Sequence, residues 1–593
     1  MKNISTIYGE TLEREHPLKE HPNPYFERKD YLSLNGPWLF AKNKSQSFPE
    51  KYDREIIVPF SVETPLSGIN EKVEADDFLH YKKVVSIPEG EWNSFARLVF
   101  TAVDQETKVY IDGELVVESR FGYIPFECVF PLKGRREITI EVLVLDDTES
   151  PLHARGKQSN HPKGIWYHPT SGIWGSVYLE FLLDEDYLTS LVIDPDYETK
   201  KLHLKVCRNG ENVSCSVDVL FKDEKVASLT LDSTLEGEVD LSSHFYPWNA
   251  EEPNVYDLIF HNGKDEVLSH FCFRKIEKVM QNGNAFILVN GKPTFLSALL
   301  DQGYYPESGL TAPSFDALKE DILFAKKAGF NTLRKHIKIE PLRWYYLCDT
   351  LGMYVIQDFV SGGAPYSFLS VSIPGIFPKY QKNDAHSKGL GRQAKESRDF
   401  FEEEFLRTFS HLRNVPSIVV WTLFNEGWGQ FEAVRMTKKL RQLDQNRLID
   451  STSGWYDKGV GDFSSYHIYF YSILKMRNDK KRILSLSEFG GYGLKVPGHT
   501  YSEKAFGYKN FKSKEELETA LKKLYGDVLR TIKEQGLGVA VYTELTDIEE
   551  ELNGLLTYDR KVEKCDREVL KDLNTALYNE YSEIFENGLN ELK

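Results

Sequence analysis

The chain has 593 residues, enough for about three domains, because single domains mostly run to roughly 100 to 200 residues. Hydrophobic residues make up 41% of it and charged residues 27%, which is ordinary for a folded globular protein and excludes a disordered chain. The formal net charge of -17, without a local basic patch, repels phosphate backbones, so we expect no nucleic acid partner.

The N-terminal segment, MKNISTIYGE, is polar and lacks the apolar run of a signal peptide. No stretch of about 18 apolar residues follows it, so we expect no contact with a membrane. The six cysteines lie far apart, without the CxxC spacing of a zinc site, and are predicted to be mostly buried thiols. These features favour a cytoplasmic protein. Its oligomeric state stays open, a homo-oligomer included.

From about residue 30 to 180, short alternating runs bounded by Gly, Pro and Asp predict an all-β sandwich. Its clearest strands are Phe78 to Ile87, Ala96 to Ala102 and Glu137 to Leu145. The segment VYIDGELV carries the pair Asp112-Gly113 between two apolar strands, which predicts a tight hairpin. Further runs up to about residue 275, among them LHLKVC and CSVDVLFKD, have the spacing of an immunoglobulin-like sandwich.

After residue 276, apolar strand cores alternate with amphipathic helical stretches, which indicates βα units and a parallel sheet. Eight strands are expected, at Thr294 to Asp301, Thr332 to Ile337, Met353 to Phe359, Ser417 to Asn425, Leu448 to Ser453, Ser464 to Phe470, Ile483 to Glu488 and Gly538 to Thr546. Eight such units over about 300 residues fit a (β/α)8 TIM barrel. An open doubly wound sheet is the alternative, but LLDQGYYPESG after the first strand is not a glycine-rich phosphate turn.

Two glutamates end strands of this barrel. Glu426 follows SIVVWTLFN and Glu488 ends ILSLSE, by our count on strands four and seven, across the barrel mouth from each other. Catalytic groups of TIM barrels lie at the carboxyl ends of strands. Cleavage of a glycosidic bond with retention needs an acid and a nucleophilic carboxylate about 5 Å apart. The alternative for each glutamate is an ion pair with a nearby Arg or Lys.

The sequence resembles glycoside hydrolase family 2 from about residue 30 to 560. The matching segments are GIWYHPTSGIWGSVYLE at 164 to 180, LVNGKPTFL at 288 to 296, NTLRKHIKIEPLRWYYLCDTLGMYVIQD at 331 to 358, RNVPSIVVWTLFNEGWG at 413 to 429 and SLSEFGGYG at 485 to 493. The resemblance implies a jelly-roll sugar-binding domain at residues 1–182, an immunoglobulin-like β-sandwich at 183–276 and a catalytic barrel at 277–593.

The resemblance also implies roles for individual residues. Glu426, in the family's Asn-Glu motif, looks like the acid/base and Glu488 like the nucleophile. Arg334 matches the family arginine near the nucleophile, where its charge would lower the pKa of Glu488. Asn425 could hydrogen-bond the sugar 2-hydroxyl, an interaction that strengthens in the transition state.

Other strand ends supply weaker candidates for contact with substrate. Asp301 ends strand one, where family members bind the sugar. His336, His467 and Tyr469 end strands two and six and could hydrogen-bond substrate or nucleophile, although a lone histidine is more often a satisfied core residue. Trp455 is a candidate stacking platform, with packing as the alternative.

Two departures from the family bear on the sugar. Some members place a Trp on strand eight, where YTELTD has Leu545, and β-glucuronidases hold the sugar carboxylate with an Asn-x-Lys pair at the positions of Glu551 and Asn553. A glucuronide is therefore disfavoured, and a terminal β-linked galactoside is our working hypothesis. No cofactor and no metal are expected, because no cluster of His and Asp ligands or HxH motif supports a metal-dependent hydrolase. The alternative outside enzymes is a non-catalytic carbohydrate-binding protein on the same scaffold.

Overall fold

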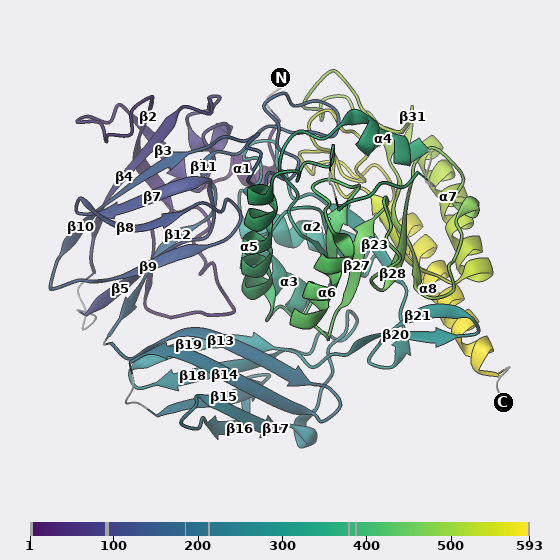
Figure 1. The fold of residues 1–593 in the computed structure, drawn as a ribbon, viewed down its shortest axis with the longest axis horizontal. Helices are drawn as coiled ribbons and strands as arrows, with labels where there is room; N and C mark the ends of the chain where they lie inside the picture. Colours follow the sequence, from purple (N-terminus) through teal and green to yellow (C-terminus); the bar gives the residue numbers. More distant parts are fainter. Residues whose placement is uncertain are drawn as a thin grey trace.

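The structure, a computed structural model, describes residues 4–88, 94–183, 185–210, 214–376, 380–385 and 388–590. Figure 1 shows three parts: an N-terminal sandwich beside a barrel of strands and helices, and a second sandwich below both. This architecture is the jelly-roll sandwich, immunoglobulin-like sandwich and (β/α)8 barrel that the sequence predicts. The domain boundaries at residues 182 and 276 stay predictions.

The N-terminal sandwich packs two antiparallel sheets around a core that includes Trp38, Leu98 and Val142. Its strands are β1 (Tyr31–Ser33), β2 (Gly36–Asn43), β3 (Arg54–Val58), β4 (Phe78–Ser86), β5 (Phe95–Phe100), β6 (Val103–Asp104), β7 (Glu106–Ile111), β8 (Glu114–Ser119), β9 (Phe126–Pro131), β10 (Glu137–Leu145), β11 (Gly172–Ile173) and β12 (Val177–Leu182). The sheets have the orders β1-β12-β5-β9 and β3-β2-β4-β10-β7-β8. The predicted hairpin is present between β7 and β8, where Asp112 and Gly113 have φ angles of 51° and 84°, as a type I′ turn requires.

The second sandwich has a three-stranded sheet, β13-β14-β17, and a four-stranded sheet, β16-β15-β18-β19. These strands are β13 (Tyr187–Asp196), β14 (Lys201–Asn209), β15 (Cys215–Phe221), β16 (Glu224–Thr230), β17 (Glu236–Asp240), β18 (Tyr256–Asn262) and β19 (Asp265–Phe271). A buried ion cluster joins it to the first sandwich. Arg28 donates to Glu180 on β12 at 2.7 Å and to Asp265 on β19 at 2.7 Å, and Arg97 also donates to Glu180 at 2.7 Å.

A short antiparallel sheet of β20 (Ile276–Gln281), β21 (Asn284–Val289) and β22 (Lys292–Pro293) leads into the barrel. All eight predicted barrel strands are present: β23 (Leu296–Asp301), β24 (Thr332–Lys335), β25 (Tyr354–Asp358), β26 (Ile418–Asn425), β27 (Leu448–Ser453), β28 (Phe463–Ile468), β29 (Ile483–Gly490) and β32 (Leu537–Thr543). They pair in the order β27-β26-β25-β24-β23-β32-β29-β28. Side chains bridge the remaining seam between β27 and β28, where Ser465 Oγ donates to Asp450 Oδ2 at 2.6 Å. Two short strands, β30 (Tyr492–Leu494) and β31 (Lys509–Phe511), pair outside the barrel.

The barrel helices follow local sequence signals. They are α2 (Phe315–Lys327), α3 (Leu342–Leu351), α4 (Phe368–Ile376), α5 (Lys395–Leu412), α6 (Ala433–Leu443), α7 (Lys514–Gln535) and α8 (Arg567–Asn590), after a single N-terminal turn, α1 (Ile7–Glu10). In α7, Ser513 caps the first turn by accepting from the backbone N–H of Glu516, and Gly536 ends the helix with φ at 68°. Leu517, Leu521 and Val528 bury one face of it against the barrel.

A segment of the first sandwich, residues 153–176, reaches the mouth of the barrel. The backbone N–H groups of Arg155 and Gly156 both donate to the carbonyl of Ser361, at 2.9 and 3.0 Å. Further on, the Tyr167 hydroxyl donates to Glu551, and the N–H of His168 donates to Glu549 at 2.9 Å. The barrel mouth is therefore built partly by residues that precede β12 of the first sandwich.

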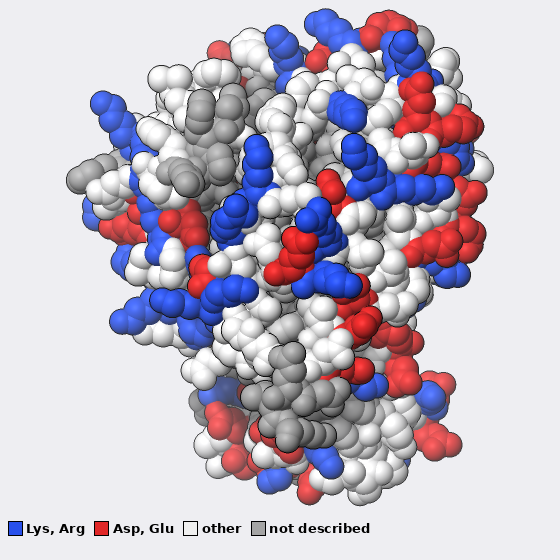
Figure 2. All heavy atoms as spheres, turned by 90° about the vertical axis from the view of Figure 1, so that its right-hand side faces the viewer, with Lys and Arg blue, Asp and Glu red and all other residues white. Residues whose placement is uncertain are grey.

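The outer surface of the barrel carries α7 and α8, on the right of Figure 1. Figure 2 shows this side with basic and acidic side chains interspersed among uncharged residues. Within the described ranges, no helix combines the length and the apolarity needed to cross a bilayer. Of the six cysteines, four are buried and each is a free thiol.

Candidate active site

The predicted catalytic residues meet at the carboxyl ends of the barrel strands. Asn425 ends β26 and Glu426 follows it, Glu488 lies near the end of β29, and Arg334 lies on β24. Glu426 and Glu488 are buried, with 8% and 5% of their surfaces exposed. Glu426 has a φ of 51°, a left-handed conformation that costs energy outside glycine and is concentrated at functional sites.

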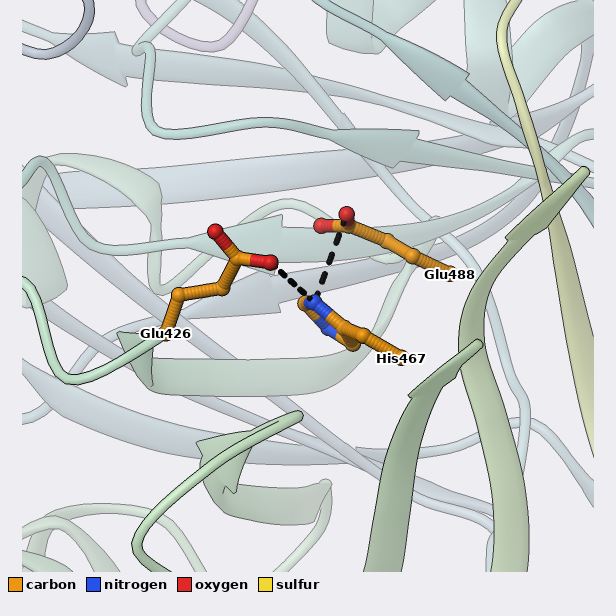
Figure 3. Close-up of side chains that lie close together, drawn as sticks. All are labelled: Glu426, His467 and Glu488. Carbon is orange, nitrogen blue, oxygen red and sulfur yellow. Dashed lines mark hydrogen bonds and ion pairs between the residues drawn. The ribbon is translucent and has the colours of Figure 1, made fainter. Parts of the chain in front are cut away.

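His467, on β28, lies between the two glutamates (Figure 3). Its Nδ1 is 2.8 Å from Glu426 Oε1 and 3.3 Å from Glu488 Oε2. On the other side of the ring, Nε2 is 2.9 Å from the Ser453 hydroxyl, which fixes the ring plane. One carboxylate oxygen of each glutamate and a ring nitrogen of His467 all lie within 4.8 Å of one another.

Glu488 is surrounded by groups that stabilise its charge. The Tyr469 hydroxyl donates to Oε2 at 2.6 Å, and Arg334 donates to Oε1 at 3.2 Å. Burial alone would raise the pKa of this carboxyl, but the charges of His467 and Arg334 and the Tyr469 hydrogen bond outweigh burial and lower the pKa to about 2. Glu488 is therefore ionised at neutral pH, the form that a nucleophile needs.

Glu426 has the opposite electrostatic environment. Burial raises its pKa, the negative charge of Glu488 raises it further, and the hydrogen bond with His467 only partly opposes the rise. Two carboxyl groups whose surroundings move their pKa values in opposite directions suit an acid and a nucleophile side by side.

Arg334 is held rigidly. It is 1% exposed and donates from Nε and Nη2 to the carboxylate of Asp358 at 3.1 and 3.0 Å. It also donates to Asn425 Oδ1 at 2.7 Å and to the carbonyl of Ser487 at 2.9 Å. While Asn425 Oδ1 accepts from Arg334, Asn425 Nδ2 has no partner among the described residues. This leaves Nδ2 available for the predicted contact with a sugar hydroxyl.

The weaker candidates divide. Tyr469 contacts Glu488, and His467 contacts both Glu426 and Glu488. His336 lies one contact away, since its Nδ1 is 2.9 Å from Asp358, and burial lowers its pKa to about 4. The Trp455 ring lies 6.5 Å from that of His467.

Asp301 does not reach the catalytic pair through any contact of the described residues. It forms a buried ion pair with Lys335 at 2.6 Å and accepts from the N–H of Gly303 at 3.0 Å. Lys335 in turn contacts Glu340 at 2.8 Å. The predicted contact of Asp301 with a sugar stays a prediction.

Strand eight approaches the site at Thr543 and not at Leu545, the position where some family members place a Trp. Leu545 is 1% exposed and packs in the main hydrophobic core. The hydroxyl of Thr543 lies 2.9 Å from that of Tyr469, which donates to Glu488. The ring of Tyr508 stacks on Tyr469 at a centroid distance of 3.8 Å.

Other residues near the site were missed from sequence. They are Lys157 and Tyr167 from the sandwich segment, Gln302 after β23, Tyr508 after β30 and Glu544 after β32. Gln302 and Glu544 each directly follow a barrel strand, β23 and β32, and this position is the sequence signal that points to them. The two sandwich residues had no such signal, because only the folded chain brings residues 153–176 to the barrel.

The trio Glu426, His467 and Glu488 also offers ligands of types that zinc accepts. Their distances fit hydrogen bonding between the side chains equally well. The expectation that catalysis needs no metal stays a prediction.

Three comparisons bear on this geometry. The model of the family "Glycosyl hydrolases family 2, TIM barrel domain" matches residues 280–485. The β-galactosidase of Oenococcus oeni is 23% identical over 490 residues, covering 74% of this chain and 44% of its own, and that of Halalkalibacterium halodurans is 24% identical, covering 84% and 51%. The chain thus spans about half the length of these curated relatives.

Solved structures share the whole fold at low sequence identity. A β-glucuronidase from an uncultured Clostridium species superimposes with a TM-score of 0.72 at 15% identity, covering 94% of this chain and 99% of its own. A family 2 β-galacturonidase from Eisenbergiella tayi, bound to galacturonate, superimposes with a TM-score of 0.69 at 18% identity, covering 93% and 98%. The family model on the barrel and the curated similarity over most of the sequence both support the predicted resemblance to glycoside hydrolase family 2.

Proposed function

We propose that this chain is a retaining, exo-acting glycosidase that removes a terminal β-linked sugar, with Glu426 as acid/base and Glu488 as nucleophile. The spacing of the two carboxylates carries the proposal, since an oxygen of one lies within 4.8 Å of an oxygen of the other. Retaining glycosidases hold the two groups about 5 to 5.5 Å apart, whereas inverting enzymes leave about 6.5 to 9.5 Å for a water molecule.

In the first step, ionised Glu488 attacks the anomeric carbon while protonated Glu426 gives its proton to the glycosidic oxygen. The carbon–oxygen bond to the leaving group breaks, and an ester bond to Glu488 forms. The opposed pKa shifts of the two groups support these protonation states.

In the second step, Glu426 takes a proton from water, and the resulting hydroxyl attacks the anomeric carbon. Burial and then the charge of Glu488 raise the pKa of Glu426 before the reaction. Formation of the ester removes that charge, so the pKa of Glu426 falls. Glu426 thereby becomes a base. Glu488 leaves as a carboxylate, stabilised by Arg334 and Tyr469.

The proposed sugar is galactoside-like, and no cofactor takes part. The curated relatives are named β-galactosidase, and the positions that hold a uronate in β-glucuronidases carry Glu551 and Asn553. The six unpaired cysteines support a reducing compartment, for which we propose the cytoplasm.

The test is release of nitrophenol from a panel of aryl β-glycosides by wild type, Glu488→Ala, Glu426→Ala and the control Glu404→Gln. Glu404 is also a buried glutamate, but it lies on helix α5 and not at the end of a barrel strand, so its variant reports nonspecific damage. We expect one glycoside to be turned over, Glu488→Ala to abolish its turnover and Glu404→Gln to leave it intact.

Glu426→Ala should retain far more activity on dinitrophenyl than on nitrophenyl glycosides, because the better leaving group needs no proton. NMR should show the β-anomer as first product. Release of the α-anomer first would contradict the retaining mechanism. Saturable sugar binding without turnover across the panel would favour the carbohydrate-binding alternative.

A further inference from the structure

A second polar cluster lies at the barrel mouth beyond the catalytic pair. Gln302 donates from Nε2 to Glu544 Oε2 at 2.6 Å and to the Tyr167 hydroxyl at 2.8 Å. The Tyr167 hydroxyl donates in turn to Glu551, which also accepts from Asn553 Nδ2 at 2.9 Å. These residues come from the ends of β23 and β32, the loop after β32 and the sandwich segment, so the cluster ties two domains together.

Several acceptor oxygens of this cluster are buried yet have no partner among the described residues. They are Glu544 Oε1, Gln302 Oε1 and Asn553 Oδ1. The residues that carry them are 1%, 3% and 0% exposed. Buried polar atoms in folded proteins are nearly all hydrogen-bonded, so three unpartnered oxygens in one cluster indicate a place where donors from a ligand bind.

Lys157, from the sandwich segment, places a cation next to this cluster. Its ammonium lies 5.7 Å from the centre of the Tyr167 ring and 5.4 Å from that of Trp428. The residue is 6% exposed, and its ammonium forms no ion pair or hydrogen bond with the residues that the structure describes. An ammonium without such a partner has its N–H donors available to a ligand at the barrel mouth.

Lys157 also connects the cluster to the catalytic centre. Its charge opposes the rise in pKa that burial causes at both Glu426 and Glu544, so it lies within electrostatic reach of both. The Tyr508 ring stacks on Tyr469, which donates to Glu488. Burial is the main cause that raises the pKa of Tyr508, and the charges of Glu551 and Glu544 raise it further. Glu544 also directly follows Thr543, whose hydroxyl lies 2.9 Å from that of Tyr469, so the cluster adjoins the pair of glutamates.

We propose that Lys157, Gln302 and Glu544 form a subsite that binds hydroxyl groups of the terminal sugar and selects a neutral sugar over a uronate. This inference rests on the proposed glycosidase function and names its substrate class. Hydroxyl groups can donate to the unpartnered oxygens and accept from the ammonium. A sugar carboxylate would add negative charge beside Glu551 and Glu544, where burial and then the charge of Glu551 already raise the pKa of Glu544 well above its usual range.

The experiment measures sugar binding by calorimetry, so that it does not depend on turnover. Galactose and glucose are each compared with their 6-carboxylates, galacturonate and glucuronate, on wild type, Lys157→Met and Glu544→Gln. Lys163→Met is the matched control, since Lys163 lies exposed on the same segment. Thermal unfolding of each variant checks that it folds.

We expect wild type to bind a neutral sugar more tightly than its 6-carboxylate. Lys157→Met should weaken that binding about 10- to 100-fold, the loss expected for one hydrogen bond from a charged donor. Glu544→Gln should weaken it too, while Lys163→Met should not. Deoxygenated galactosides identify the hydroxyl: the deoxy sugar that lacks the partner of Lys157 should bind wild type and Lys157→Met equally.

Three outcomes would overturn the inference. In the first, a uronate binds more tightly than its neutral sugar and this binding depends on Lys157. In the second, Lys157→Met and Lys163→Met bind the sugars equally well. In the third, wild type binds none of the four sugars. Binding of a neutral sugar without turnover of any glycoside would instead leave the subsite intact and count against the glycosidase proposal.

Discussion

The hydrogen bond from Tyr469 to Glu488 gives a prediction about which step of the reaction limits turnover. The 2.6 Å bond stabilises a carboxylate, and hydrogen bonds to charged groups contribute about 1.5 to 3 kcal/mol. Tyr469→Phe removes the bond but keeps the ring that stacks on Tyr508. In the second step Glu488 must leave as a carboxylate, so we expect hydrolysis of the glycosyl-enzyme to slow about 10- to 150-fold.

The first step should suffer little, because the same bond stabilises Glu488 before it attacks. With a dinitrophenyl glycoside, kcat should therefore fall by the stated factor while kcat/KM stays nearly constant and KM falls in step. Stopped-flow measurement should show a burst of one dinitrophenol per chain. Tyr466→Phe is the control, since Tyr466 lies on β28 shortly before Tyr469 and its hydroxyl donates to the carbonyl of Arg477. A fall in kcat/KM as large as that in kcat, without a burst, would refute the reasoning.

Three further predictions concern charge. The pKa of Glu488 is lowered from 4.5 to about 2, so its ionised form stabilises the fold above pH 4.5, and this stabilisation is lost as the pH falls toward 2. Glu488→Gln should therefore reduce the change in unfolding free energy over this pH range by about 3 kcal/mol, which urea unfolding at each pH would measure. Glu180→Gln should destabilise the sandwiches by about 3 to 5 kcal/mol, measured by the same unfolding, because Arg28 and Arg97 lose a buried partner, and a loss below 1 kcal/mol would contradict it. A chelator should leave glycoside turnover unchanged, and inhibition by the chelator alone would indicate a catalytic metal. Added zinc should inhibit turnover, because it would compete with substrate for the two carboxylates and His467.

The fold was readable from sequence where local and global signals agree. The run SIVVWTLFN predicts a fully buried parallel strand, and β26 is buried along its whole length. Asp112-Gly113 predicts a turn whose two residues both have positive φ. These features depend on neighbours along the chain, so the sequence contains them directly.

The site was only partly readable, because its contacts join distant residues. Glu426 and Glu488 could be singled out as polar residues that end apolar strands. The position of His467 between them depends on the seam between β27 and β28, which no local pattern encodes. For Asp301, the ion pair with Lys335 depends on the register of β23 against β24.

The reach of residues 153–176 onto the barrel has a consequence for how substrate preference can change in this protein. The carboxylates belong to the barrel, whereas Lys157 lies in the segment before β12 of the first sandwich, whose residues Ala154 and Tyr167 pack in the core of the barrel. Exchange of the sandwich with that of a relative would thus replace part of the proposed subsite, the wall of the site that Lys157 forms, and leave Glu426 and Glu488 in place. The accuracy of that wall then depends on how firmly one domain docks on the other, and so on hydrogen bonds such as those from Arg155 and Gly156 to Ser361.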